Sequence, residues 1–162
     1  MIGIIADTHD NMEAISKAVD FFNSRKVSLV LHAGDLISPF TAREFKRLNS
    51  KLIAVFGNNE GEKEGLRKKF SELGVELRDF YEIEHKDKRI FLYHGTYEEI
   101  VSMAVKSGEY DIVMRGHTHE AKIEKIGSTL VINPGEACGY LTGRRTIALL
   151  DLAKMQVEIH EI

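Results

Sequence analysis

Short apolar runs alternate with helical patterns along the first half of the chain. Runs rich in Val, Ile and Leu predict strands at residues 2–6, 29–33 and 52–56. Between and after them, apolar residues recur every three or four positions and predict three helices. Their apolar faces carry Met12, Ile15, Ala18, Val19 and Phe22, then Phe40, Phe45 and Leu48, then Leu66, Phe70 and Leu73. Asp10 or Asn11 is the expected N-cap of the first helix, Ser38-Pro39 begins the second and Gly74 ends the third. This alternation predicts βαβ units with parallel strands.

The pattern changes after Gly74. Apolar runs at residues 75–78, 81–85 and 89–93 lie close together, and one further helix is expected to bury Tyr97, Ile100, Val101, Ala104 and Val105. A strand follows at residues 111–114, then a hairpin around Gly127-Ser128, then runs at residues 145–150 and 155–160. With only two prolines and no linker or repeat, we predict one α/β domain over residues 1–162. Two sheets packed face to face with helices outside are expected.

Composition narrows the class of protein further. The net charge of −3 and a pI near 6.2 argue against a nucleic-acid coat or a polybasic membrane anchor. The single cysteine, Cys138, excludes an internal disulfide and fits a reducing compartment. No secretory signal is visible, and no run approaches the roughly 20 apolar residues of a membrane span. We therefore expect a cytoplasmic protein that does not bind membranes.

Metal-binding side chains directly follow five of the predicted strands. The motifs are Asp7-Thr8-His9, Gly34-Asp35, Gly57-Asn58-Asn59-Glu60, His94-Gly95 and Gly116-His117-Thr118-His119. They offer oxygen and nitrogen donors without a thiolate, the donor set of a two-metal centre. Because ligands of open α/β sheets gather beyond the carboxyl ends of the strands, motifs far apart in sequence are expected to meet. The sequence therefore predicts a dinuclear metal site at the C-terminal ends of the strands.

Chemistry suggests how these residues divide between two ions. A carboxylate can bridge two cations, whereas a neutral imidazole or an Asn carbonyl serves one. Asp35, in the middle of the set, is the expected bridge. Asp7 and His9 lie two residues apart, and a loop after a strand can turn both toward one ion. His117 and His119 have the same spacing and are open to division between neighbouring ions. His32, His85 and His160 lie inside strand runs and are assigned no role in the site.

The five motifs, in this order, resemble those of the calcineurin-like metallophosphoesterase superfamily. The small size and the Asn133-Pro134-Gly135 turn resemble its compact bacterial and archaeal phosphodiesterase branch. The resemblance implies a four-layer αββα sandwich of two mixed β-sheets flanked by helices. It also implies two ligand sets that share Asp35: Asp7, His9, Asp35 and His119 for the first metal, and Asp35, Asn58, His94 and His117 for the second.

One position departs from the family pattern. The family motif continues G-N-H-[DE], and its histidine contacts the phosphate and is thought to protonate the leaving oxygen, whereas this chain has Asn59. An amide donates a hydrogen bond but delivers no proton, and general acid catalysis is worth about 10²–10⁴-fold. We therefore predict a phosphodiesterase with weak or no monoesterase activity, with Asn59 and Asp35 as catalytic residues. Asn11 and Arg115 are further candidate donors to the phosphoryl oxygens, and Glu60 is expected to be a surface or helix-start acid.

The expected reaction uses hydroxide formed from a water between two divalent cations about 3.5–4 Å apart. Mn²⁺ is the expected ion for activity, with Ni²⁺, Fe²⁺, Co²⁺ or Zn²⁺ as further options. The expected partner is a small phosphodiester, without stable nucleic-acid binding. Homodimer formation is left open, as is the role of residues 134–143, which either overhang the site or form a subunit contact; Cys138 within them is expected to be incidental.

Two alternatives remain. One is a protein-binding scaffold with a vestigial metal site, as in the metallophosphoesterase-like subunit of the retromer coat; the complete ligand set argues against it. The other is a phosphomonoesterase or nuclease of the superfamily. The nuclease is disfavoured, because the sequence shows no basic or aromatic-rich appended domain.

Overall fold

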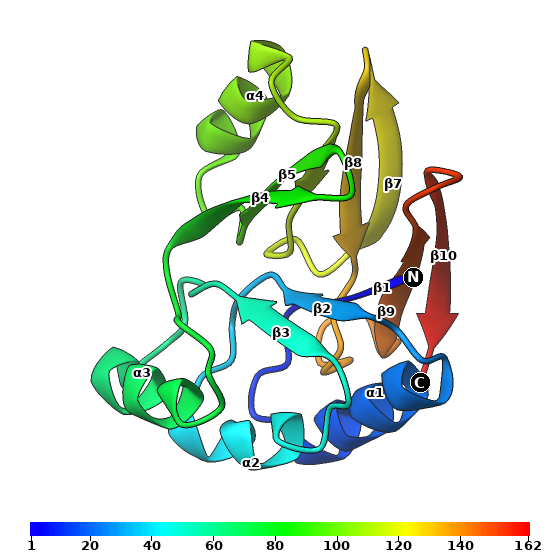
Figure 1. Ribbon diagram of the computed structural model, residues 1–162. Coiled ribbons are helices and arrows are strands. Elements are labelled where there is room, and N and C mark those ends of the chain that lie inside the picture. The colour runs from blue at the N-terminus through cyan, green and yellow to red at the C-terminus, as the bar shows by residue number, and fades with distance from the viewer.

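Two five-stranded sheets pack face to face in the computed structural model, which describes residues 1–162 (Figure 1). The first sheet has the order β10-β9-β1-β2-β3 and the second β4-β5-β6-β8-β7. The strand bounds are β1 (Ile2–Ile5), β2 (Leu29–His32), β3 (Lys51–Ala54), β4 (Phe80–His85), β5 (Lys88–Tyr93), β6 (Ile112–Met114), β7 (Ala121–Ile126), β8 (Thr129–Pro134), β9 (Thr146–Asp151) and β10 (Gln156–Glu161). Helices cover both outer faces, so the predicted four-layer αββα sandwich of mixed sheets is confirmed.

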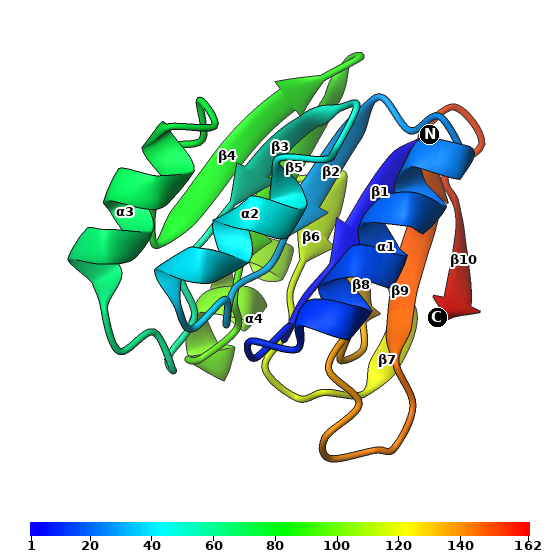
Figure 2. The same cartoon turned by 90° about the horizontal axis from the view of Figure 1, so that it is seen from below.

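The first sheet follows the predicted βαβ logic. Strands β1, β2 and β3 are parallel, whereas β9 and β10 add antiparallel neighbours at the other edge. Helices α1 (Met12–Ser24), α2 (Ala42–Phe45) and α3 (Lys63–Ser71), with the 3₁₀ turn η1 (Pro39–Thr41), cover its outer face (Figure 2). Asn11 caps α1, because its side chain accepts a hydrogen bond from the Ala14 N–H.

Close contact between α1 and β1 depends on a glycine. A Cβ atom on Gly3 would lie only 2.6 Å from the ring of Phe22, which is 1% exposed. Alternation along β1 then sends Ile4 into the layer between the sheets, where it packs among Leu31, Leu92 and other apolar residues of both sheets. The strand is therefore buried on both faces.

The second sheet carries a single covering helix, α4 (Glu98–Ser107). Its residues Val101 and Ala104 pack on Phe91, Val113 and Val131. The predicted apolar face is wrong in part, because Tyr97 precedes the helix and is exposed, and Ile100 is also partly exposed. No helix anywhere in the structure combines the length and apolar character needed to cross a bilayer.

Two other expectations need correction. Residues 75–78 are not a strand, since they form only an isolated bridge between Arg78 and Val55. The second helix is short, and it follows a 3₁₀ turn with about three residues per turn rather than 3.6. This change of pitch turns Phe40 outward while Phe45 stays buried.

Candidate metal centre

The loops after β1, β2, β3, β5 and β6 converge at one end of the sandwich, and all seven predicted ligands meet there. The loops after β1, β6 and β8 lie together at the bottom of Figure 2. Every predicted ligand has a side-chain atom within 4 Å of another member of the set. Residues separated by up to 112 positions in sequence therefore form one polar cluster, as predicted.

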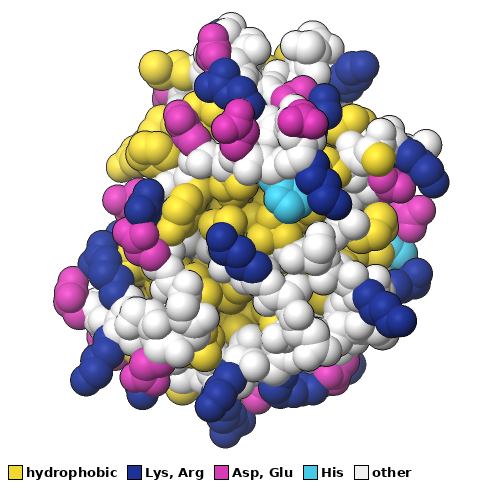
Figure 3. All heavy atoms as spheres, in the orientation of Figure 1, with side chains coloured by type: hydrophobic (Ala, Val, Ile, Leu, Met, Phe, Trp, Pro, Cys, Tyr) yellow, Lys and Arg dark blue, Asp and Glu magenta, His cyan; other side chains and the backbone are white.

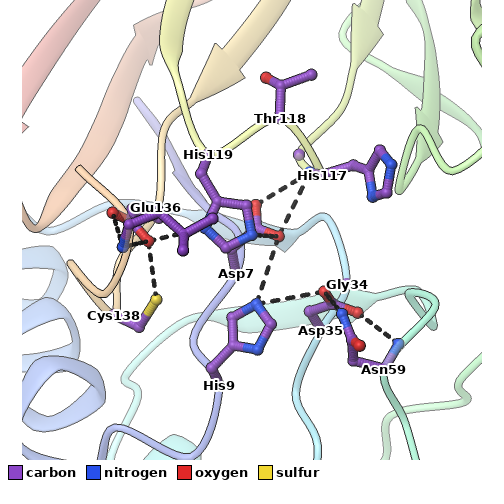
Figure 4. Close-up of polar contacts among 12 residues, drawn as sticks. Asp7, His9, Gly34, Asp35, Asn59, His117, Thr118, His119, Glu136 and Cys138 are labelled. Carbon is purple, nitrogen blue, oxygen red and sulfur yellow. Dashed lines mark hydrogen bonds and ion pairs between the residues drawn. The ribbon is translucent and has the colours of Figure 1, made fainter.

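Four of these residues form a first ligand group. Candidate ligand atoms of Asp7, His9, Asp35 and His119 all lie within 4.8 Å of one another (Figure 4). Nε2 of His9 is 3.3 Å from Asp35 Oδ2, and Nε2 of His119 is 3.5 Å from Asp7 Oδ1. Nε2 of His9 is buried without a hydrogen-bond partner. An unpartnered imidazole nitrogen beside two buried carboxylates is the arrangement that a cation satisfies.

The second group has the same character. Nδ1 of His94 lies 2.7 Å from the carbonyl oxygen of Ala33, which can only accept, so Nδ1 carries the proton. In a neutral ring, Nε2 of His94 would then have its lone pair toward Asn58 Oδ1, 2.9 Å away, and Nδ1 of His117 is 2.9 Å from that same oxygen. Burial lowers the pKa of His94, but the neighbouring carboxylate of Asp35 outweighs it and raises that pKa. The position attracts positive charge, as a metal site does.

Asp35 joins the two groups. Its Oδ2 lies 3.3 Å from His9 Nε2 and 3.4 Å from His94 Nε2. Asn59 holds the same carboxylate, because its backbone N–H donates to Oδ1 at 2.9 Å and its side-chain amide to Oδ2 at 2.7 Å. Although burial opposes ionisation, the interaction with His94 and the hydrogen bonds from Asn59 hold the pKa of Asp35 well below its usual range. Asp35 is therefore an anion at the position expected of the bridge.

Backbone conformation explains how residues two apart reach one centre. Left-handed φ angles occur at five members of the set: Asp7 (52°), His9 (41°), Asp35 (60°), His117 (71°) and His119 (63°). Such angles are uncommon for residues other than glycine and are held only where the surroundings over-determine them. The strain thus lies at the positions whose side chains converge.

Two buried polar residues support the loops beneath the ligands. Burial lowers the pKa of His32 to about 3, so the ring is neutral; its Nδ1 accepts from the Gly34 N–H, and its Nε2 donates to Thr8 Oγ1. The expectation for Glu60 is wrong. Its carboxylate is nearly buried and accepts the N–H groups of Leu36 at 3.0 Å and Gly57 at 2.8 Å. The Glu60 carboxylate thereby links the loop that carries Asp35 to the loop that carries Asn58.

Sequence reasoning missed Glu136, which is fully buried behind His119. Its Oε2 accepts the Nδ1 proton of His119 at 2.7 Å, which leaves Nε2 of that ring free to face Asp7. Burial raises the pKa of Glu136, but hydrogen bonds from His119 and Thr142 outweigh it and lower the pKa to about 2. Carboxylates behind ligating histidines fix the tautomer and orientation of the ring. The only available signal was its place beyond the end of a strand.

Three other residues are already engaged. Asn11 donates its side-chain amide to the Cys138 carbonyl, and Arg115 is paired with Glu98, so neither is free to reach a phosphoryl oxygen. Burial raises the pKa of the Cys138 thiol to about 12, and this thiol, expected to be incidental, donates to Glu136 Oε2 at 3.2 Å and lies close to His9 and His119. Asn59 is engaged as well, since it donates to Asp35, so all three donor candidates from the sequence have protein partners in this structure.

Glu136→Gln is expected to weaken divalent-metal binding by about 10–100-fold, because His119 loses its charged orienting partner. Isothermal titration of the metal-free protein with Mn²⁺ measures this change. Glu120→Gln, at an exposed position near the site, is the matched control and should bind like the wild type. Equal affinities in all three proteins would show that Glu136 serves only the loop.

Comparisons with known proteins agree with this geometry. Residues 1–155 match the family model described as the calcineurin-like phosphoesterase superfamily domain. A phosphodiesterase of Methanocaldococcus jannaschii is 45% identical over 157 residues, which cover 96% of this chain and 95% of the relative. The solved structure of an archaeal phosphodiesterase superposes with a TM-score of 0.96 at 43% identity and 99% coverage of both chains. Vps29 of Chaetomium thermophilum, at 16% identity, 99% and 96% coverage and a TM-score of 0.74, shares the fold.

Proposed function

The chain belongs to the calcineurin-like phosphoesterase superfamily and is a phosphodiesterase, and we propose that it hydrolyses small diesters at a centre of two divalent metal ions. The observation that carries the proposal is the convergence of seven side chains with oxygen and nitrogen ligand atoms, in two groups that Asp35 joins through His9 and His94. Bound cations would satisfy the lone pairs of such a set.

The donor chemistry fits the metals that the family implies. Asp7, His9 and His119 would hold one ion, Asn58, His94 and His117 the other, and Asp35 both. When bound, two divalent cations lower the pKa of a water molecule and polarise the phosphoryl oxygens. Mixed imidazole and oxygen donors suit Mn²⁺, Fe²⁺, Co²⁺, Ni²⁺ and Zn²⁺ alike. Of these, Mn²⁺ is the ion proposed to support activity.

The residues themselves explain the preference for diesters. Asn59 supports the bridging carboxylate with both of its N–H groups and holds no proton that it could transfer to a leaving oxygen. Asn11 donates to the Cys138 carbonyl, and Arg115 pairs with Glu98. Turnover then depends on a leaving group that departs without protonation, as from an activated or strained diester.

The alternatives find less support. A scaffold with a vestigial site would have no need for seven converging donors, their strained backbone and Glu136 behind them. For the nuclease alternative, the net charge of −3 is unlike that of a protein built to bind a polyanion. On the face drawn in Figure 3, Lys and Arg side chains are likewise interspersed with Asp and Glu. A small phosphodiester therefore remains the preferred substrate.

The test compares bis(p-nitrophenyl) phosphate with p-nitrophenyl phosphate, each with and without added Mn²⁺. Diester hydrolysis that requires the metal, with much slower monoester hydrolysis, is the expected result. Faster monoester turnover would overturn the diester preference, and activity that survives EDTA would overturn the metal centre.

Asn59→His is expected to raise the rate of hydrolysis of diesters with poor leaving groups. The expected gain is about 10²-fold, the lower limit of what general acid catalysis contributes. Methyl-ester and p-nitrophenyl-ester rates, measured at saturating Mn²⁺, separate the poor from the good leaving group. Asn59→Ala removes the same amide without adding an acid and serves as the control. A two-metal histidine variant without any gain on the poor leaving group would refute the missing-acid explanation.

A further inference from the structure

The segment after β8 folds around one buried carboxylate. Glu136 accepts the backbone N–H of Tyr140 at 3.1 Å and that of Leu141 at 3.0 Å, and Thr142 Oγ1 donates to it at 2.7 Å. Cys138 N also donates to the Asp7 carbonyl at 3.0 Å. The backbone of residues 136–142 is thereby fixed against the candidate metal centre.

Two apolar side chains point away from this fixed backbone. Tyr140 is 62% exposed and Leu141 is 74% exposed, and neither belongs to a core cluster. We call Tyr140 and Leu141 the rim pair. An isolated exposed apolar residue needs no explanation, but these two adjoin each other on a loop whose backbone is fixed.

The rim pair lies beside the first ligand group. The ring centroid of Tyr140 is 6.5 Å from that of His9, and the carboxylate that fixes the rim backbone also accepts the Nδ1 proton of His119. In Figure 4, Glu136 and Cys138 of this segment stand next to His119 and His9. A phosphate held by both ligand groups would therefore place one of its organic substituents near the rim pair.

The charges of the segment indicate what kind of substituent fits. Its two arginines turn away, since Arg144 pairs with Glu161 at 3.3 Å and Arg145 with Glu13 at 3.2 Å. Both arginines therefore have acidic partners of their own. An exposed aromatic ring next to a leucine instead offers stacking and apolar contact.

We propose that Tyr140 and Leu141 form a specificity site for an uncharged aromatic substituent of the diester, such as a nucleobase. This inference rests on the proposed phosphodiesterase function. It assigns the rim pair to substrate selection, whereas the bond-breaking chemistry stays with the ligand groups.

The experiment compares two esters with the same leaving group: the p-nitrophenyl ester of thymidine 5′-monophosphate and methyl p-nitrophenyl phosphate. The measured quantity is the ratio of their kcat/KM values in the Mn²⁺-loaded protein. The wild type should favour the thymidine ester. Tyr140→Ala should lower the ratio roughly 5- to 100-fold, as base–aromatic stacking is lost, with the change in KM rather than kcat. Leu141→Ala should lower it less.

Two variants serve as controls. Tyr140→Phe keeps the ring and should keep the ratio, and Met103→Ala removes a side chain that is 70% exposed on α4, outside the ligand loops. Truncation at Tyr140 or Leu141 leaves the backbone N–H groups on Glu136 in place, so the loop should still fold. Circular dichroism and bound Mn²⁺ per chain check this.

Several outcomes overturn the proposal. An unchanged ratio in Tyr140→Ala, or an equal loss on both esters, would give the pair no part in selection. A dimer of the wild type that Leu141→Ala converts to a monomer, seen by light scattering, would make the pair a subunit contact. If the metal-loaded wild type hydrolyses neither ester, the proposed function fails instead.

Discussion

Replacing Asp35 with asparagine is expected to lower diester hydrolysis by about 10³-fold or more, because one carboxylate serves both ligand groups. Asparagine keeps the shape of the side chain but removes its negative charge, and its carbonyl oxygen serves only one cation. His9 Nε2 and His94 Nε2, which now face the same Oδ2 at 3.3 and 3.4 Å, would lose their common partner. The measurements are kcat/KM on bis(p-nitrophenyl) phosphate and metal content after dialysis against Mn²⁺.

Asp20→Asn is the matched control, since this exposed carboxylate pairs only with Arg47 on the helical layer. It should keep wild-type activity and metal content. Wild-type activity in Asp35→Asn, with the variant folded by circular dichroism, would show that hydrolysis does not need the Asp35 carboxylate.

Gly57→Ala is expected to displace the carboxylate of Asp35 by steric overlap. A Cβ atom at this position would lie 2.1 Å from Asp35 Oδ1 and 2.5 Å from Asp35 N, so the Asp35 loop must move. Overpacking of this kind typically costs about 1–3 kcal/mol in the free energy of unfolding. Loss of the groups that support metal ligands typically lowers metal affinity or activity by about 10–100-fold. We expect the diester hydrolysis rate of Gly57→Ala to fall by an amount near the upper end of that range.

Gly61→Ala is a close control, because a Cβ there would meet nothing within 4 Å. It lies in the same segment between β3 and α3 and should behave like the wild type in urea unfolding and in diester hydrolysis. Equal behaviour of both alanine variants would mean that the glycine of the motif is not needed for close approach to Asp35.

Residue patterns predicted the fold well where burial is continuous. Parallel β1, β2 and β3 were recognisable because each is a short apolar run followed by a helical pattern or a motif. The errors fell where local geometry changes pitch or pairing, as at Phe40 in the 3₁₀ turn and at residues 75–78. Periodicity does not distinguish a 3₁₀ turn from the first turn of an α-helix.

The convergence of the candidate ligands could be predicted from the sequence, whereas the residues that hydrogen-bond to them could not. Ligands follow strands in recognisable motifs, so their convergence could be expected. Glu136 and Glu60 act through hydrogen bonds to groups distant in sequence, His119 Nδ1 and the N–H groups of Leu36 and Gly57. Nothing in the local sequence around either glutamate specifies such a partner.

Anomalous diffraction from crystals soaked in Mn²⁺ tests most directly whether the protein holds a dinuclear metal centre bridged by Asp35. Two peaks are expected on either side of Asp35 Oδ2, one among Asp7, His9 and His119 and the other among Asn58, His94 and His117. A single peak in an active, Mn²⁺-saturated protein, or peaks away from Asp35, would contradict it.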